Sequence, residues 1–410
     1  MRVVRPLLFL SLPMALALSA CTGAGTPDPS TGIDVGATAS SSGPTATSSQ
    51  APSTAPSPTA EPALAWADGT AVEWGKPVSP QASTPKVAGT VAAVVPGSTP
   101  LPWGFAKDQV LSSQENPDSF DAGNNVFKNH PVLALGPRQL TTAKGTDGAE
   151  PGQVLGAAID DHGVVWAQTP SAQAGFTPWT VYTSQPDGSA VKHILSSGDE
   201  HDVEFVPGHL VLTDDMAVFA VGSEADRQIV AAYRNADERV TVPAPGASDV
   251  WAAGGRDTVM WEQHEDGVTQ IVKAVAAGDL AMSWSVVLSV AAETTGEEPS
   301  PLRLLAASGN VALVAQGETV AVVNLKTNSV REVSGVKASS LDPSAAEAGG
   351  GRVAVPVAGG SGKGTRVLSV APDGAVQLLT FPATEGGIAV DADQVAVTTT
   401  AGKLTVLAIG

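Results

Sequence analysis

The sequence predicts an all-β protein: a β-propeller, with seven blades favoured and six as the alternative, that follows a disordered N-terminal linker. Three observations predict this fold. One strand pattern returns six times at a similar interval, turn-forming residues separate alternating apolar runs, and no long amphipathic helix occurs after residue 64. Short antiparallel strands repeated in this way bury their faces against one another when the repeats close into a ring.

The repeat begins at about residue 150. In each unit a short apolar strand is entered from Asp, Asn or Gly, a second strand follows, and then a turn and a third strand; the entering segments include AAIDDHGVVWAQ and IAVDADQVAVTT. These entering segments are spaced by about 40 to 54 positions, an interval that belongs to propeller blades. Their central residues are Val165, Phe219, Met260, Leu313, Ala354 and Ala396.

The second half of each unit predicts a β-hairpin. Pro-Asp-Gly separates two alternating runs in WTVYTSQPDGSAVKHIL and again in RVLSVAPDGAVQLL. Asp-Gly between strands favours a type I′ turn, because glycine adopts a positive φ at little cost. We therefore expect Gly188 to occupy a type I′ turn.

Closure of the ring is predicted from the two ends of the propeller domain, residues 64–410. The last unit, GIAVDADQVAVTTTAGKLTVLAIG, contains only three strands, and GTVAAVV (89–95) is a candidate for the missing one. LPWGFAKDQVLSS and HPVLALGPRQLTT supply a first blade, which brings the total to seven. A pair of β-sandwiches is the rival architecture, but sandwiches do not usually repeat at this interval.

The repeats resemble bacterial β-propellers of the TolB-like and YVTN-like kind. The resemblance covers most of residues 150–410 and lies in the order of strand, Asp or Gly turn, and strand. The Ser-Pro-Asp-Gly start typical of TolB blades is absent, and so is the Trp-Asp pair of the WD40 class. The resemblance therefore supports the fold and leaves the partner open.

Residues 1–20 have the pattern of a signal peptide. Arg2 and Arg5 precede the apolar stretch PLLFLSLPMALAL, which is too short to span a bilayer, since a spanning helix needs roughly 20 residues. Small residues at the end of the stretch fit cleavage by a signal peptidase.

The stretch ends in Leu18-Ser19-Ala20-Cys21, which resembles the lipobox of bacterial lipoproteins. The resemblance implies that the peptidase recognises Leu18, Ser19 and Ala20. It also implies that Cys21 is alkylated by diacylglycerol and becomes the mature N-terminus. The protein would then be lipid-anchored at the extracytoplasmic face of the cell membrane. A secretory signal that happens to end near a cysteine is the alternative.

Residues 21–63 are expected to form a disordered linker. From residue 22 the segment is dominated by Ser, Thr, Pro, Ala and Gly, and such a composition cannot bury enough apolar surface to offset the entropy of ordering. A flexible coil of about forty residues spans roughly 35 Å root-mean-square. A linker of this reach would hold a folded domain away from a membrane surface.

The charge balance excludes some partners. Acidic residues outnumber basic ones 41 to 22, which gives a formal net charge of -19. Nucleic acid is therefore not expected as a partner, because phosphate binding needs clustered Lys and Arg. Cys21 is the single cysteine, so no internal disulfide can form.

The densest polar stretch is KHILSSGDEHDVEFVPGH. Its His and acidic side chains are of the type that binds Zn²⁺, but their spacing fits no closed motif and favours a solvated loop between blades. The residues concerned are His193, Asp199, Glu200, His201, Asp202, Glu204 and His209. Asp160, Asp161 and His162 are expected to bond the backbone of a turn rather than to perform chemistry.

Two other motifs fail on inspection. AGGSGKGTR (358–366) lacks the Gly-x4-Gly-Lys-Ser/Thr order of a phosphate loop and lies between two strands. Asp391 and Asp393 lack the rest of a calcium loop. No catalytic residue, metal or cofactor is assigned from the sequence.

Trp166 and Trp261 occupy matching positions in two blades, which predicts packing between blades. The other tryptophans, which follow no such pattern, are Trp66, Trp74, Trp103, Trp179, Trp251 and Trp284. Tryptophan beside carboxylates can also stack on sugars, so glycan binding is an alternative to core packing.

The sequence thus favours a membrane-tethered binding or scaffold module for a protein or other component of the cell envelope. A propeller enzyme, such as a hydrolase, lyase or dehydrogenase, is the main alternative. It would need histidines, carboxylates or a metal gathered at the ring's axis from several blades. A substrate-binding lipoprotein for uptake is a third hypothesis, but those proteins are usually α/β.

Overall fold

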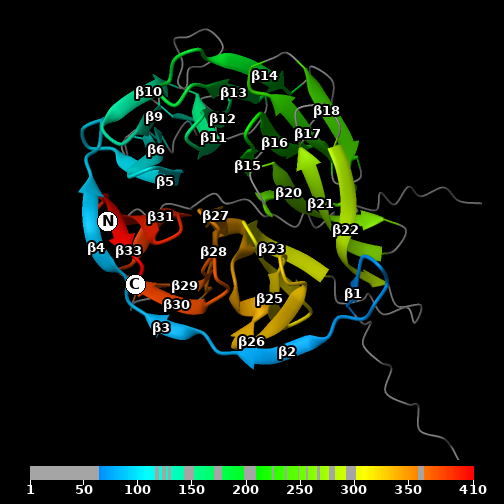
Figure 1. Ribbon diagram of the computed structural model, residues 1–410. Coiled ribbons are helices and arrows are strands. Elements are labelled where there is room, and N and C mark those ends of the chain that lie inside the picture. Colours follow the sequence, from blue (N-terminus) through cyan, green and yellow to red (C-terminus); the bar gives the residue numbers. More distant parts are fainter. Residues whose placement is uncertain are drawn as a thin grey trace, which may run out of the picture. The chain divides into compact units, whose positions relative to one another are not determined.

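Seven β-sheets, antiparallel apart from two parallel edge strands, stand around a common axis in the computed structural model (Figure 1). The sheets are the blades of a β-propeller, and the seven-blade prediction is confirmed over the six-blade alternative. The structure describes residues 64–410 with the exception of 116–119, 122–125, 128–130, 143–151, 170–177, 198–208, 224–225, 236–237, 248, 255–256, 266–267, 277–281, 292–301 and 359–363.

The first three blades each have four strands, named from the axis outward. The first blade consists of β5 (Thr99–Ala106), β6 (Gln109–Glu115), β9 (Val132–Leu135) and β10 (Arg138–Thr142). The second consists of β11 (Gln153–Ile159), β12 (Val164–Thr169), β13 (Thr180–Ser184) and β14 (Lys192–Ser196). The third consists of β15 (Leu210–Leu212), β16 (Met216–Val221), β17 (Gln228–Tyr233) and β18 (Arg239–Pro243).

The next three blades have the same four strands and a fifth at the outer edge. The fourth blade contains β19 (Val250–Ala252), β20 (Thr258–Glu265), β21 (Val268–Ala276) and β22 (Met282–Ala291). The fifth contains β23 (Leu302–Ser308), β24 (Val311–Gln316), β25 (Thr319–Asn324) and β26 (Ser329–Lys337). The sixth contains β27 (Glu347–Gly349), β28 (Arg352–Pro356), β29 (Thr365–Val370) and β30 (Val376–Phe381).

The seventh blade joins the two ends of the domain. Its strands β31 (Thr384–Val390), β32 (Gln394–Thr399) and β33 (Leu404–Ala408) come from the C-terminal end, and β4 (Lys86–Val91) pairs antiparallel with β33 as the fourth strand. The missing strand thus comes from before residue 150, as expected, although it covers 86–91 rather than 89–95. The predicted first blade is confirmed in β5, β6, β9 and β10.

Residues 64–91, which we call the strap, run around the outside of four consecutive blades (Figure 1). β1 (Ala65–Trp66) pairs antiparallel with β22 of the fourth blade. β2 (Trp74–Val78) and β3 (Gln81–Ser83) pair parallel with β26 and β30 of the fifth and sixth blades. β4 then completes the seventh. The sequence analysis did not predict the first three of these additions.

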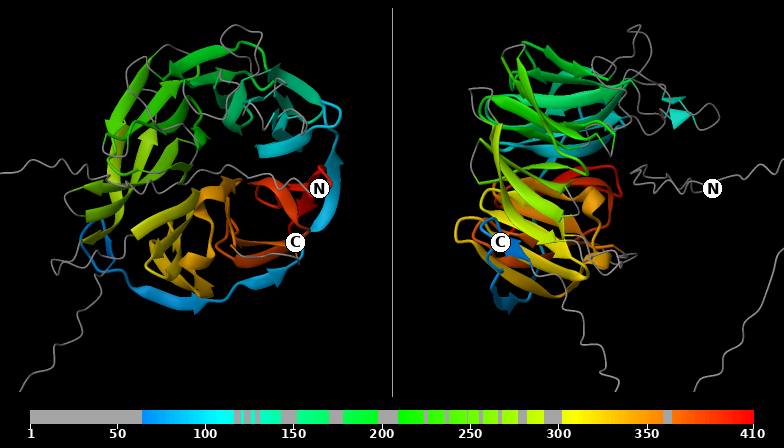
Figure 2. Two further views of the ribbon diagram at one scale, coloured as in Figure 1. Left: turned by 180° about the vertical axis from the view of Figure 1, so that it is seen from behind. Right: turned by 90° about the vertical axis from the view of Figure 1, so that its right-hand side faces the viewer.

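The remaining elements are small. β7 (Phe120–Asp121) and β8 (Val126–Phe127) form a two-stranded sheet that stands apart from the blades (Figure 2). Two single-turn 3₁₀ helices, η2 (Ala338–Ser340) and η3 (Pro343–Ala345), precede β27. Within the described part of the chain, no helix combines the length and apolar character that crossing a membrane requires.

Apolar packing runs around the whole ring. One cluster of buried residues joins the first and second blades, and others join each later pair, ending with Val110 of the first blade against Ala389, Ala396 and Leu404 of the seventh. The six central residues predicted from the repeat all lie in the second strand of a blade, and each is at most 1% exposed. The repeat in the sequence is therefore the repeat of this buried strand.

Trp166 and Trp261 do pack between blades. Trp166 lies in the cluster that joins the first and second blades, and Trp261 lies in the one that joins the third and fourth. Each indole Nε1–H donates to the glutamine two residues further on, at 3.1 Å to Gln168 and 3.0 Å to Gln263. The same Trp–Gln hydrogen bond thus occurs in two blades, because a buried indole N–H needs an acceptor.

The predicted turn type at Gly188 is wrong. Gly188 N–H donates to Gln185 O at 2.9 Å, and within this turn only Gly188, at φ +79°, has a positive φ. The turn is therefore type I over Gln185–Gly188, with the glycine as a left-handed fourth residue. Proline decides this outcome, because Pro186 fixes a negative φ at the second position, where type I′ requires a positive one.

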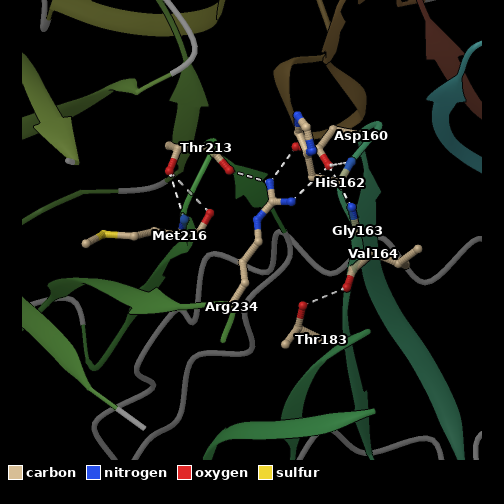
Figure 3. Close-up of polar contacts among 8 residues, drawn as sticks. All are labelled: Asp160, His162, Gly163, Val164, Thr183, Thr213, Met216 and Arg234. Atoms are coloured by element: carbon tan, nitrogen blue, oxygen red, sulfur yellow. Dashed lines mark hydrogen bonds and ion pairs between the residues drawn. The ribbon is translucent and has the colours of Figure 1, made fainter. Parts of the chain in front are cut away.

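Polar side chains also link neighbouring blades. Arg352 of the sixth blade donates to Ala392 O of the seventh at 2.8 Å, and the Glu262 carboxylate of the fourth accepts from Leu304 N–H of the fifth at 2.8 Å. Figure 3 shows a third link, in which Arg234 of the third blade pairs with Asp160 of the second. These contacts fix the rotation of each blade relative to the next.

The order of strands gives the ring two different faces. Each innermost strand begins at one face, and the links from the second to the third strand lie there too; we call this the loop face. The hairpins between the first and second strands and between the third and fourth form the opposite hairpin face. Links on the loop face run as long as 197–209 and 338–346, whereas the longest on the hairpin face is 185–191.

Candidate functional site

Three ionisable side chains stand where innermost strands begin, at the loop face. His209 and Asp249 immediately precede β15 and β19, and Glu347 is the first residue of β27. The innermost strands contact one another in succession around the ring, from β5 to β31 and back to β5. His209, Asp249 and Glu347 therefore lie at or next to the start of an innermost strand in the third, fourth and sixth blades, at one end of the axis. We call these three residues the axial cluster.

The local structure places Asp249 and Glu347 at this end of the axis. A tight turn precedes Asp249, in which Ala247 N–H donates to Ala244 O at 3.0 Å. The 3₁₀ turns η2 and η3 lead the chain back from the rim before Glu347. The β strands that follow then continue into the core, because their next residues are apolar.

The charge of Asp249 affects the pKa of both other members. Burial raises the pKa of Glu347 well above its ordinary value, and the negative charge of Asp249 raises it further. Burial also lowers the pKa of His209, against an opposing effect of Asp249.

Aromatic packing positions the imidazole. The ring of His209 lies against that of Trp251, with centroids 3.9 Å apart and planes tilted by 49°. Trp251 is itself buried, in the apolar cluster that joins the fourth, fifth and sixth blades. His209 is thus positioned by the neighbouring fourth blade.

His209 and Glu347 are enclosed by protein, and all three axial side chains keep part of their surface accessible to water. This combination is expected for groups at the axis of a ring. The site offers a carboxyl group whose pKa is raised and an imidazole whose pKa is lowered, both by burial. No group of three or more His, Cys, Asp or Glu side chains in the described part of the chain is arranged to hold a metal ion.

The polar stretch 192–209 is not brought together as one site. His193 lies on β14, the outermost strand of the second blade, where its Nε2 and the Ser196 Oγ are 2.8 Å apart. His209 lies at the axis, in the next blade. Asp199, Glu200, His201, Asp202 and Glu204 lie outside the described residues, so the predicted solvated loop stays a prediction there.

The turn at Asp160 behaves as predicted. Its Oδ1 accepts from the backbone N–H groups of His162 at 2.8 Å and Gly163 at 2.9 Å (Figure 3). The sequence did not predict the second role of this carboxylate, which also binds Arg234. The pair lies on the hairpin face and is structural.

The other motifs considered in the sequence form no site among the described residues. The loop of AGGSGKGTR joins β28 and β29, as predicted, but residues 359–363 lie outside the described part. Leu18, Ser19, Ala20 and Cys21 also lie outside it. Asp391 and Asp393 belong to the short turn between β31 and β32.

Most tryptophans with described side chains are core residues. Trp166, Trp179, Trp251 and Trp261 are at most 3% exposed, so their ring faces are not free to stack on sugars. Trp66 and Trp103 are partly buried against the core, and Trp74 on the strap is exposed, at 43%. Trp284 has no described side chain.

Asp249 and Glu347 were missed because they are distant in sequence from each other and from His209. Only the repeat could have found them. GHLVL, SDVWA and AEAGG align when each is placed at the start of its blade, and an ionisable residue then precedes or begins each innermost strand.

The chain is thus a closed seven-bladed β-propeller with an axial cluster at its loop face. No protein-family model matches the sequence, and no curated protein matches it. Solved structures match at low identity.

One match is a puromycin-hydrolysing peptidase of Mycobacterium tuberculosis, with 12% identity and a TM-score of 0.44 over 79% of this chain and 55% of the peptidase. Another is PorZ, a bacterial surface component of the type IX secretion system of Porphyromonas gingivalis. It has 10% identity and a TM-score of 0.47 over 78% of this chain and 38% of PorZ. TolB from Acinetobacter baumannii has 12% identity and a TM-score of 0.33 over 56% of this chain and 60% of TolB. The chain spans about half the length of the peptidase, and these likenesses concern the fold alone.

Proposed function

We propose that the protein is an extracytoplasmic lipoprotein that presents its propeller as a binding module for a protein or other component of the cell envelope. In this proposal Cys21 carries the diacylglycerol anchor and the linker 21–63 lets the propeller reach away from the membrane. The loop face holds the ligand. The formal charge of -19 opposes contact with anionic headgroups, which favours a lipid over a basic surface as the means of attachment.

The difference between the two faces carries the proposal for the binding side. Connecting segments hold most binding residues in proteins, because a rigid scaffold can position them while their sequences vary. Here the longest links and the axial cluster share one face, and short hairpins cover the other. A ligand on the loop face could contact links from several blades at once.

Cross-linking in living cells tests the face. A photoreactive amino acid is placed at Ser344 or Ala401, which are exposed on the loop face, and at Lys326 or Asp373, which are exposed on the hairpin face. We expect one dominant adduct from the first pair and none from the second. Equal adducts from both pairs, or none from either, would contradict a binding role for the loop face.

Mass spectrometry and detergent partitioning test the anchor. The mature protein should begin at Cys21 and carry a diacylglycerol thioether, and Cys21→Ser should abolish the detergent-phase fraction. A Ser19→Thr variant, which keeps Cys21, serves as the control for the signal peptide. A Cys21→Ser variant that partitions like the unchanged protein would exclude lipid attachment at this residue.

The axial cluster also favours a second function, a propeller enzyme. It gathers a carboxyl group and a neutral imidazole from separate blades, and such pairs can act as general acid and base. Turnover distinguishes the two functions. When the protein is incubated with a panel of envelope glycans and peptides, an enzyme forms products and His209→Gln abolishes their formation. A binding module forms complexes without products.

A further inference from the structure

Glu262 joins the fourth blade to the fifth through a buried carboxylate. Its side chain is 9% exposed, and Oε2 accepts from Leu304 N–H at 2.8 Å. Leu304 lies on β23, an innermost strand that has a neighbouring strand on one side, and a bulge between Leu304 and Ala306 interrupts its pairing with β24. The carboxylate thus bonds a backbone donor of the next blade at the point where the strand pairing is irregular.

His264 lies beside the other oxygen of this carboxylate. Its Nε2 is 3.2 Å from Glu262 Oε1, and its Nδ1 is 3.1 Å from Thr269 Oγ1. Glu262 and His264 are two residues apart on β20, so their side chains share one face of the strand. Thr269 is the cross-strand partner of His264 on β21. We call Glu262, His264 and Thr269 the junction cluster.

The imidazole is reached by solvent and yet confined. The His264 side chain is 44% exposed, so it can exchange protons with water. The link 244–249 covers one edge of the ring, because a Cβ on Gly246 would collide with His264 Cδ2. His264 N–H also donates to Pro245 O of this link at 2.8 Å. The ring is therefore confined beside Glu262.

Both charge states of the imidazole can make these contacts, but they differ electrostatically. The neutral ring donates from Nε2 to Glu262 and accepts the Thr269 hydroxyl at Nδ1. The protonated ring donates from both nitrogens, because a hydroxyl can also accept. The protonated ring alone brings a positive charge to the buried carboxylate, and an opposite charge at this distance favours the charged form. The folded protein therefore favours protonation of His264 relative to the unfolded chain.

Other charged residues stand on the elements that pack against β20. Positive charges there oppose protonation of His264, and negative charges favour it. They are Arg303 on β23, Lys273 on β21 and Asp249 in the link 244–249, whereas the side chains of Glu265 and Asp266 lie outside the described part. Because Glu262 is in direct contact with the ring, its charge should have the largest effect.

We propose that the junction cluster is a pH-sensitive switch between the fourth and fifth blades. His264 takes one proton from water, and the resulting ion pair stabilises Glu262 in its contact with Leu304 N–H. This stabilisation is complete below the ordinary histidine value of about 6.5 and is lost as rising pH removes the proton from the folded protein. No covalent bond between heavy atoms changes. The inference does not depend on the lipid anchor or on a ligand of the loop face.

Amide exchange at Leu304 reports on the junction directly, because this N–H bonds Glu262. The full-length protein is labelled with ¹⁵N-leucine, and protection relative to the intrinsic exchange rate is compared at about pH 5.5 and about pH 7.5, on either side of the histidine range. We expect protection to fall about threefold or more as pH rises. NMR titration of the His264 imidazole should give a midpoint above about 6.5.

Two variants separate the ion pair from the rest of the structure. Glu262→Gln keeps an acceptor for Leu304 N–H and removes the charge, so it should lower the titration midpoint of His264 and make the protection independent of pH. His264→Gln should also make the protection independent of pH.

Two further variants are controls. His162 is exposed on the hairpin face, so His162→Gln should keep the pH response of the unchanged protein. Thr269→Ser keeps the hydroxyl beside Nδ1 and should keep the response as well.

Three results would overturn the inference. They are a His264 midpoint at or below about 6.5 in the unchanged protein, equal protection of Leu304 at both pH values, and a pH response that Glu262→Gln leaves intact. The first two need no variant, so they decide the question even where a variant fails to fold. Neither measurement involves a membrane or a ligand, so failure of the proposed function would leave both unchanged.

Discussion

Arg234 holds Asp160 of the preceding blade with both arms of its guanidinium group (Figure 3). Nη1 donates to Oδ1 at 2.9 Å, and Nη2 donates to Oδ2 and to Thr213 O. Asp160 meanwhile bonds two N–H groups of its own turn. One carboxylate thus shapes a hairpin and fastens it to the next blade.

Breaking this pair should destabilise the ring. Arg234 is 6% exposed and Asp160 is 30% exposed, so the pair is less buried than those whose loss costs most. We expect Arg234→Met to cost about 2 kcal/mol of unfolding free energy, because the carboxylate and Thr213 O lose their donor. Urea denaturation measures the change.

Asp160→Asn is the second arm of the double-mutant cycle, because an amide oxygen can still accept the turn N–H groups. We expect it to cost less than Arg234→Met, with a coupling energy of about 1 kcal/mol. Strictly additive effects would show that the ion pair itself contributes nothing.

Replacing Gly188 by alanine should cost more stability than replacing another glycine that closes the same kind of hydrogen-bonded turn. Its φ is +79°, and a Cβ there would lie 2.9 Å from Leu140 O of the first blade. Gly402 forms the same hydrogen-bonded turn with φ +70°, but its Cβ would approach only Thr99 Oγ1, at 3.7 Å. Both Ala variants suffer the backbone strain of about 1 kcal/mol, and only Gly188→Ala adds a clash.

Thermal unfolding of the two variants tests this comparison. We expect Gly188→Ala to lower the melting temperature clearly more than Gly402→Ala. Equal shifts would mean that the second blade moves away from Leu140 at little cost.

The raised pKa of Glu347 predicts the direction in which folding stability changes with pH. In the folded state this carboxyl keeps its proton above the ordinary value of about 4.3, and in the unfolded state it loses it there. Stability conferred by the protonated group is therefore lost as pH rises from about 4.3 through the raised folded-state pKa.

Glu347→Gln removes this dependence. The variant should gain stability over the unchanged protein as pH rises through that window, by at most about 1.4 kcal/mol per pH unit, and the gain should then level off. Denaturation at a series of pH values gives the curve. His209 is present in both proteins and largely cancels in the difference. A gain that is constant with pH would contradict the raised pKa.

The strap should divide into a dispensable part and an essential part. Residues 64–83 add outer strands to blades that already have four, although they bury Leu64 and Val72. β4 supplies the fourth strand of the seventh blade. We expect deletion of 64–83 to lower the melting temperature and keep one cooperative transition, and deletion of 64–91 to abolish it.

Differential scanning calorimetry compares the two deletions, with the Cys21 region left unchanged in both. Cooperative unfolding of the longer deletion would show that three strands suffice for the seventh blade.

The fold could be predicted from sequence because its evidence is local and repeated. Val165, Phe219 and Met260 lie in equivalent apolar strands, and any one of these strands alone would have been ambiguous. β2 and β3 escaped prediction because their residues are largely exposed, as Trp74 shows, so no apolar period marks them, and β1 has only two residues. The type I′ prediction for the turn at Gly188 was wrong because Pro186 fixes a negative φ at the second position of the turn.

The site was harder to predict for a physical reason. Its residues come from three blades, and only closure of the ring brings them together. His209 was named for its neighbours in sequence, none of which is its partner in space among the described residues. Arg234 and Asp160, 74 positions apart, were separated in the same way.

The strap also determines how the protein would respond to tension. A pull applied at residue 64 acts first on β1, whose two residues pair antiparallel with β22, and only later on β2, β3 and β4. The rim would detach one blade at a time, so that extension begins long before the seventh blade opens. Force at this end would therefore be absorbed in steps along the circumference, while the axis stays assembled until β4 yields.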